Sequence, residues 1–223
     1  MPSGLCARRC SDGRERFPGQ VDPAAARARS PGDRVAIDHA LQRLSGLSPE
    51  ATRKVAWRLV QHNLLVRLGP GLYGNRFQLP RLEAVASLVG RPAYLSRESA
   101  LSERGVLSQM PAILTCVTTG KPRRLQTPLG DIRLYHLREE LFFGYLNRNG
   151  ILWAQPEKAV LDWVYLDRKA GLPSPSLDEL RWTALSSRTL RAYGRRYPKS
   201  VWREIERWMS AGQGEGKTDT GST

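Results

Sequence analysis

The sequence lacks long apolar runs, and no stretch approaches the roughly 18 residues that a membrane-spanning helix needs. The amino terminus contains no apolar segment of the kind found in signal peptides, so we expect a cytoplasmic protein with no membrane partner. Only three cysteines are present, Cys6, Cys10 and Cys116, which are too few for a disulfide framework. Cys6 and Cys10 offer at most two of the roughly four ligands of a structural zinc site, so we expect neither a metal nor a cofactor.

Acidic residues are absent between Ala51 and Leu82, although the chain contains 21 of them in 223 residues. The whole sequence has 35 lysines and arginines and a formal net charge of +14, which favours a polyanionic partner. Nucleic acid is the first candidate, and a ribosomal or membrane-surface role is the alternative. The acid-free stretch contains six cations: Arg53, Lys54, Arg58, Arg67, Arg76 and Arg81.

Composition divides the chain into four segments. Residues 1–32 are rich in Arg, Ala, Gly, Pro and Ser, so we expect a disordered arm whose arginines either contact DNA or remain solvated. We expect residues 33–80, which include most of the acid-free stretch, to form a DNA-binding domain and residues 81–210 to form a second domain. Residues 211–223 are small, polar or charged and are expected to be a disordered tail.

Two helices are expected in the first domain. Asp33 is a suitable N-cap for the first helix, which ends at Ser45-Gly46. Ser48-Pro49-Glu50 starts the second, because serine caps the backbone, proline presets φ and glutamate complements the helix dipole. At helical spacing, one face carries Val55, Ala56, Leu59 and Val60, and the opposite face carries Lys54, Trp57, Arg58 and Gln61.

A hairpin follows the second helix. Leu64-Leu65-Val66 has strand character, Gly69-Pro70-Gly71 forms a tight turn, and Leu72-Tyr73 returns. The order helix, turn, helix, hairpin predicts a winged helix-turn-helix that binds DNA. Solvation of the basic face is the alternative, and Trp57 could instead lie in a protein interface. The predicted DNA contacts are Arg53, Lys54, Trp57, Arg58, Gln61, Arg67 and Arg76.

The second domain alternates helical and strand patterns, so the predicted fold class is α+β. Its expected sheet is small and mostly antiparallel, with a hairpin at Asn147-Arg148-Asn149-Gly150. Ser96 is expected to cap a helix that Gly105 ends, and Pro156-Glu157 opens a longer one. Further helices are expected from about Leu177, Ser187 and Lys199.

A second acid-free block extends from Leu180 to Arg203 and contains seven cations. Arg188, Arg191 and Arg195 are three and four residues apart, so they share one side of a helix. They form a possible second nucleic-acid surface, and a solvated helix is the alternative.

The sequence resembles the AbiEi antitoxin family of type IV toxin–antitoxin systems over residues 45–170. The likeness lies in Gly71-Leu72-Tyr73, in Tyr94-Leu95-Ser96 with Ser99-Ala100-Leu101 and Gly105, in Val117-Thr118-Thr119, and in the segment from Ala154 to Asp162. It implies a phage-defence repressor whose winged helix binds promoter repeats of its own operon. It also implies a second domain for assembly on DNA and antitoxin activity, and a nucleotidyltransferase-like toxin that is genetically linked but need not make contact.

An enzyme is the competing class. Asp131 followed by Glu157-Lys158 loosely resembles the acids and lysine of a metal-dependent restriction-type nuclease, but those motifs place one residue between Glu and Lys. Capping of a helix explains Pro156-Glu157 more simply, so we assign no catalytic residue. An orphan DNA- or RNA-binding regulator without a toxin is the remaining alternative.

Overall fold

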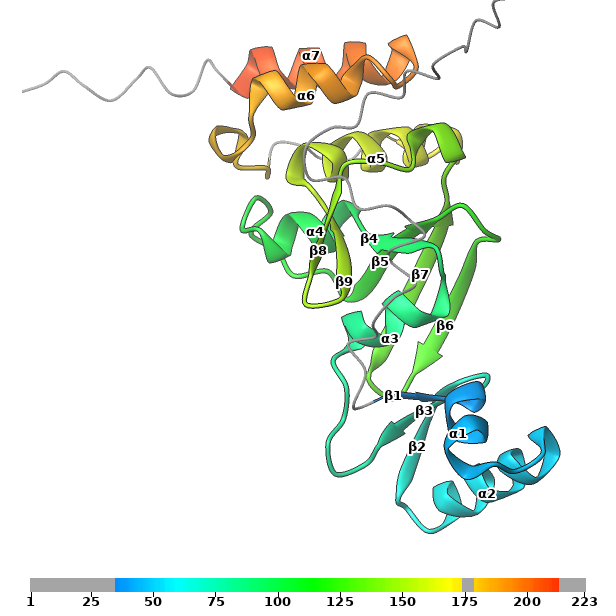
Figure 1. Cartoon of the computed structure of the whole chain (residues 1–223). Coiled ribbons are helices and arrows are strands. Elements are labelled where there is room, and N and C mark those ends of the chain that lie inside the picture. The colour runs from blue at the N-terminus through cyan, green and yellow to red at the C-terminus, as the bar shows by residue number, and fades with distance from the viewer. Residues whose placement is uncertain (1–34, 174–178, 213–223) are drawn as a thin grey trace, which may run out of the picture.

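A computed structural model describes residues 35–173 and 179–212 of the chain (Figure 1). These residues form seven α-helices and two sheets, so the predicted α+β class is confirmed. The expected arm at 1–32 and most of the expected tail lie outside the described residues. None of the helices in the described ranges combines the length and the apolar character needed to cross a bilayer.

The N-terminal part combines two helices with a three-stranded antiparallel sheet in the order β1-β3-β2. The helix expected from Asp33 was placed too early, because the structure begins it at Asp38. Residues before it pair with β3 instead and so satisfy their backbone groups as a strand. The elements are β1 (Val35–Ile37), α1 (Asp38–Ser45), α2 (Pro49–Gln61), β2 (Leu65–Gly69) and β3 (Leu72–Asn75).

Both ends of α2 follow from local sequence. The Ser48 side chain accepts a hydrogen bond from the Ala51 amide at 3.3 Å, Pro49 occupies the first turn, and Glu50 lies beside the positive end of the helix dipole. The predicted start of this helix is therefore confirmed. Asn63 has a φ of 58°, in the left-handed region that interrupts a right-handed helix.

The second sheet has six strands in the order β6-β7-β5-β4-β9-β8. Three of its five pairings are antiparallel, and β5·β7 and β4·β9 are parallel. The sheet is thus larger and more mixed than the one expected from sequence. Its strands are β4 (Ala93–Leu95), β5 (Ile113–Thr118), β6 (Arg123–Thr127), β7 (Gly130–His136), β8 (Tyr145–Arg148) and β9 (Ile151–Ala154).

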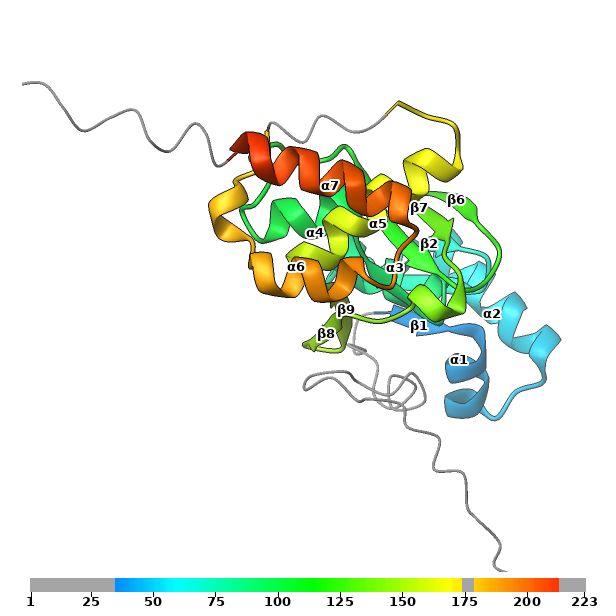
Figure 2. The same cartoon turned by 90° about the horizontal axis from the view of Figure 1, so that it is seen from above.

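Helices cover both faces of this sheet (Figures 1 and 2). Helix α3 (Leu82–Val89) packs on one face, and α4 (Arg97–Glu103) and α5 (Pro156–Lys169) pack on the other. Helices α6 (Ser187–Gly194) and α7 (Lys199–Gly212) form an outer layer on α5. Because α7 ends at Gly212, it includes the first two residues of the predicted tail. The helix expected from about Leu177 falls at the edge of the undescribed segment; Leu180 instead forms a β-bridge with Leu107.

The β2–β3 hairpin connects the two sheets. Gly71 at its turn has a φ of 66°, which glycine adopts without strain. A Cβ placed at Gly69 would lie 3.4 Å from both methyl carbons of Leu125 on β6, so the tip packs against the larger sheet. Leu68 and Leu72 belong to the same buried cluster as the larger sheet, and the hydrophobic core is therefore continuous.

Candidate nucleic-acid interface

Helix α2 presents a polar, cationic face to solvent. Thr52 and Ala56 are buried four residues apart, whereas the five predicted contact residues on this helix are all exposed. Trp57 is 62% exposed, which is unusual for so large an apolar side chain. The exposed face is Arg53, Lys54, Trp57, Arg58 and Gln61, and we call it the α2 face.

The buried side of α2 differs in one position from the sequence expectation. Val55 was assigned to the apolar face but is 39% exposed, and Thr52 is buried in its place. The Thr52 hydroxyl donates to the Ser48 carbonyl at 2.9 Å, so burial leaves its polar atom paired. Val55 therefore lies at the border between the packed side and the α2 face.

Internal contacts neutralise little of the charge on the α2 face. Lys54 Nζ lies 3.1 Å from Glu50 Oε1, but their side chains are 70% and 77% exposed, so this ion pair is weak. Arg53 Nε donates to the Pro49 carbonyl at 3.3 Å. Arg58 forms no ion pair with any carboxylate in residues 35–173 or 179–212. The cations remain available to an external anion.

The hairpin adds two exposed cations. Arg67 lies on β2 opposite Tyr73, and Arg76 follows β3 directly, with its amide bonded to the Leu64 carbonyl at 3.2 Å. The turn between them faces β6, as described above. Any contact of this hairpin with a partner therefore depends on its exposed side chains and not on its tip.

The predicted second surface lies on the outer layer. Arg188 and Arg191 belong to α6, Arg195 is its C-cap, and all three side chains are exposed. Leu190 and Tyr193 face inward. Figure 1 places α6 at the end of the molecule opposite to α2, so the two predicted surfaces are far apart in one copy of the protein.

Tyr94, Ser96, Lys158, Asp162 and Tyr197 form a buried cluster that we call the Asp162 network. Asp162 accepts hydrogen bonds from Tyr94 at 2.9 Å, Ser96 at 2.7 Å and Tyr197 at 2.6 Å, and forms an ion pair with Lys158. Ser96 precedes α4, but its hydroxyl makes no cap bond there. The network joins β4, α5 and the segment between α6 and α7.

Burial shifts the pKa values of this network. It lowers the pKa of Lys158 from its usual 10.5 to about 8, although Asp162 acts in the opposite direction. Burial also raises the pKa of Tyr94 and Tyr197, and the neighbouring Asp162 adds to both shifts. The side chains of Lys158 and Asp162 are both 0% exposed, so this pair lies within the core and presents no group to solvent.

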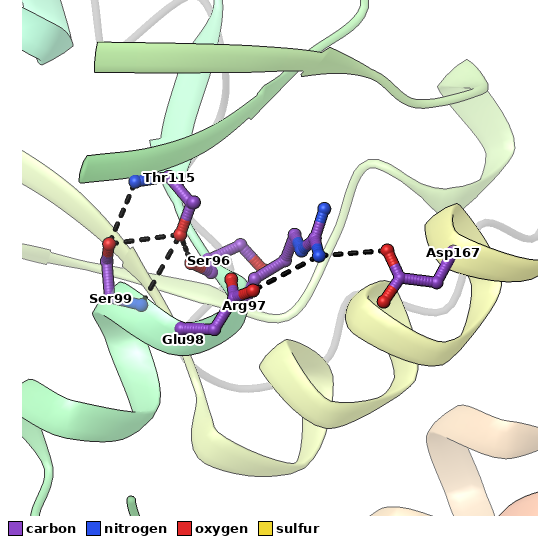
Figure 3. A network of polar contacts seen from close by, with 6 residues as sticks. All are labelled: Ser96, Arg97, Glu98, Ser99, Thr115 and Asp167. Carbon is purple, nitrogen blue, oxygen red and sulfur yellow. Dashed lines mark hydrogen bonds and ion pairs between the residues drawn. The ribbon is translucent and has the colours of Figure 1, made fainter. Parts of the chain in front are cut away.

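A second polar cluster surrounds Arg97 (Figure 3). Arg97 has a φ of 56°, a left-handed conformation that costs about 1 kcal/mol in a residue with a side chain. Its Nη2 atom lies 2.9 Å from Asp167 and 3.1 Å from Glu98, and its guanidinium lies 4.3 Å from the centre of the Tyr135 ring. These contacts join α4 to α5 and β7.

The residues of the nuclease alternative have separate roles. Asp131 pairs with Arg124, Glu157 accepts the Ser186 amide at 2.7 Å, and Lys158 belongs to the Asp162 network. Asp131 is on β7 and Glu157 follows β9, three strand positions apart and so about 14 Å across the sheet. Within the described ranges no group of three or more potential metal-binding residues occurs.

Sequence reasoning missed one cationic group. Arg123 and Arg124 lie on β6 and Arg133 lies on β7, and all three are exposed. A turn at Pro128-Leu129-Gly130 joins these strands, and their register places Arg124 opposite Arg133. Counting back from the turn is the sequence signal that could have found this pair.

No protein-family model matches this chain, and a search of the curated proteins finds no match.

Proposed function

We propose that this protein is a sequence-specific DNA-binding transcriptional autoregulator that acts as the antitoxin of a type IV toxin–antitoxin system. The observation behind the DNA-binding part is the α2 face, where cations, an amide and an aromatic side chain project from one side of a packed helix. Such side chains bind phosphates and base edges of a duplex.

The arrangement around α2 supports a winged helix-turn-helix over residues 33–80. Its order is strand, helix, helix and hairpin, with sheet order β1-β3-β2. In that architecture α2 is the recognition helix, which fits the major groove because of its width. The three-residue connection between α1 and α2, residues 46–48, matches the short turn of the motif.

We assign different roles to the exposed cations. Lys54, Arg58 and Gln61 share a stripe of α2 and bind base edges, because arginine pairs with guanine and glutamine with adenine. Arg67 and Arg76 on the hairpin bind the DNA backbone. The arginines of α6 form a further nucleic-acid surface that binds DNA beside the operator or an RNA; their distance from α2 in Figure 1 favours DNA held by another copy on the same promoter.

The antitoxin part of the proposal rests on the resemblance to the AbiEi family. Several of the residues that carry it, including Tyr94, Ser96, Lys158 and Asp162, meet in the Asp162 network. These residues therefore form part of the core of the second domain, and we assign antitoxin activity to residues on the surface of that domain. The partners that follow are promoter DNA with repeats, further copies of the chain on that DNA, and a genetically linked nucleotidyltransferase-like toxin.

The DNA-binding proposal is tested by titrating the full chain onto the DNA upstream of its own coding sequence. Arg58→Ala should weaken binding by about 1–3 kcal/mol if Arg58 pairs with a guanine. A duplex of scrambled sequence should bind weakly to the wild type and to the variant. Arg207→Ala on α7 is the matched control, because it removes one exposed arginine far from α2. Equal affinity of wild type and a Lys54→Ala/Arg58→Ala/Gln61→Ala variant would exclude the α2 face.

Arg67→Ala and Arg76→Ala should weaken all sequences about equally, and each should flatten the salt dependence by roughly one unit because one phosphate is no longer neutralised. A change in sequence preference without a change in salt slope would show that the hairpin contacts bases.

The antitoxin part is tested by expressing the protein with a nucleotidyltransferase encoded beside it. Failure to restore growth would leave an orphan regulator.

A further inference from the structure

Two arginines face each other on the strands at one edge of the larger sheet. Arg124 of β6 is directly opposite Arg133 of β7 in an antiparallel pair, so both side chains leave the same face. The Cβ atoms of such a pair are about 4.5–5.5 Å apart, and like charges at this spacing destabilise the sheet. Both side chains are exposed. Asp131 is two residues before Arg133 on the same face and pairs with Arg124, so it offsets one of the two charges. An external anion would offset the other.

Contacts with the protein fix the positions of these arginines. The Arg133 guanidinium lies 5.0 Å from the centre of the Tyr135 ring, which Arg97 also contacts from the cluster in Figure 3. Arg124 is held by Asp131, and the neighbouring Arg123 donates to the Val89 carbonyl. Side chains that are already ordered lose less conformational entropy when they bind a partner.

Protection of the sheet edge does not account for this arrangement. Cations on an edge strand prevent pairing with other chains, and Arg123 and Arg124 on β6 are sufficient for that role. Arg133 lies on β7, which is paired on both sides by β6 and β5, so it protects no edge. Its position opposite Arg124 adds repulsion that Asp131, paired with Arg124, offsets only in part, and this suggests an external anion.

The position of this pair also indicates which anion binds. Both views place β6 and α2 on the same flank of the molecule (Figures 1 and 2), and Figure 1 places α6 and α7 at the end opposite to α2. The hairpin that follows α2 packs on β6 through Gly69 and Leu125. Side chains alternate along a strand, so Arg124 and Arg133 leave the face of the sheet opposite to Leu125 and the hairpin. Because β6 is an edge strand of this sheet, a duplex in contact with the α2 face that passes along the edge reaches both arginines.

We propose that Arg124 and Arg133, assisted by Arg123 and by Lys121 just before β6, bind backbone phosphates of DNA beyond the base pairs contacted by α2. This inference rests on the proposed DNA-binding function. Guanidinium groups suit this role because they form paired hydrogen bonds with phosphate oxygens. The surface lengthens the DNA site without adding sequence specificity.

The test compares two duplexes from the upstream DNA. The short one is the smallest duplex whose affinity falls with Arg58→Ala, and the long one extends it by about one helical turn, roughly 10 base pairs, on each side. Arg124→Gln/Arg133→Gln in the full chain should weaken affinity about tenfold on the long duplex and less than about twofold on the short one. The salt slope on the long duplex should fall by about two units.

Arg203→Gln/Arg207→Gln is the matched control, because it removes the same charge from exposed positions on α7. It should change neither affinity by more than about twofold. Arg124→Lys/Arg133→Lys keeps the charge and should retain most of the salt slope while reducing the affinity in part. A cooperative thermal unfolding transition shows that a variant is folded. If a double variant does not fold, the single variant Arg133→Lys is measured in its place.

Equal decreases in affinity for the Arg124/Arg133 and Arg203/Arg207 variants would overturn the proposal, because only net charge would then matter. So would a decrease of the same size on the short and long duplexes. These outcomes leave the effect of Arg58→Ala intact and so leave the proposed function standing. If wild type binds no duplex, both proposals fail.

Discussion

The α2 face and the Asp162 network use charge in opposite ways. In the network, Lys158 is fully buried and its charge is balanced by a carboxylate that also accepts three hydroxyl hydrogen bonds. On the α2 face, Lys54 and Arg58 are exposed, and among the described residues the only ion pair that either forms is that of Lys54 with the highly exposed Glu50. One region satisfies its charges within the fold, and the other leaves them for a partner.

This difference separates stability from binding. Removing one member of a buried pair leaves the other charge without water or a partner, which is costly. Removing an exposed cation leaves nothing unpaired inside the protein. Mutations in the network should therefore change the free energy of unfolding, and mutations on the α2 face should change DNA affinity.

The largest expected effect is that of Asp162→Ala. It leaves Lys158 buried without its counter-charge and three hydroxyl groups without an acceptor, so it should destabilise the protein by about 3–5 kcal/mol. Urea unfolding followed by circular dichroism measures this change. Glu50→Ala is the control, since its carboxylate is also paired with a lysine but is exposed. It removes a surface pair and a favourable charge at the start of α2, and should change stability by about 1 kcal/mol or less. Similar values for the two variants would contradict the contrast between the regions.

A smaller effect is expected from pH. Because the pKa of Lys158 falls to about 8 on folding, the unfolded chain binds more protons than the folded chain above that pH. The free energy of unfolding should therefore rise with pH, by at most about 1.4 kcal/mol per pH unit. Close to pH 10 the raised pKa values of Tyr94 and Tyr197 act in the opposite direction, because unfolding then releases tyrosine protons.

The measurement is the difference in unfolding free energy between wild type and Lys158→Met at several pH values. Between about pH 8 and pH 9.5 this difference should grow in favour of wild type by roughly 1–2 kcal/mol. Groups elsewhere titrate alike in both proteins and cancel. Parallel curves would mean that Lys158 does not change its protonation on folding.

The smallest expected effect is on the α2 face. Glu50→Gln removes the carboxylate that pairs with Lys54 and places one fewer negative charge beside the DNA. Operator affinity should rise by about 0.2–0.5 kcal/mol, and more at low salt than at high salt. Glu206→Gln on α7 is the control for net charge, because Glu206 is exposed at the far end of the molecule. Weaker operator binding by Glu50→Gln would show that this helix start does not face DNA.

Local sequence signals predicted the elements that depend on neighbouring residues. Asn149 and Gly150 have φ values of 50° and 80°, as expected for the tight turn of a hairpin, and Pro156 begins α5. Signals that depend on distant partners were misinterpreted. Ser96 precedes α4 as expected, but its hydroxyl binds Asp162 instead of capping the helix, and Val35–Ile37 joins β3 instead of extending α1.

The sequence by itself determined the chemistry of the chain. Its net charge, the acid-free stretch from Ala51 to Leu82 and the capping residues of α2 are properties of composition and close spacing, which need no tertiary contact. The tertiary structure decided which charges are buried and which are exposed. Lys158 and Arg58 are both cations within helical patterns, but only packing places one beside Asp162 and the other in solvent. It also decided that Arg124 faces Arg133, because strand register is fixed by the pairing of whole strands and their common core.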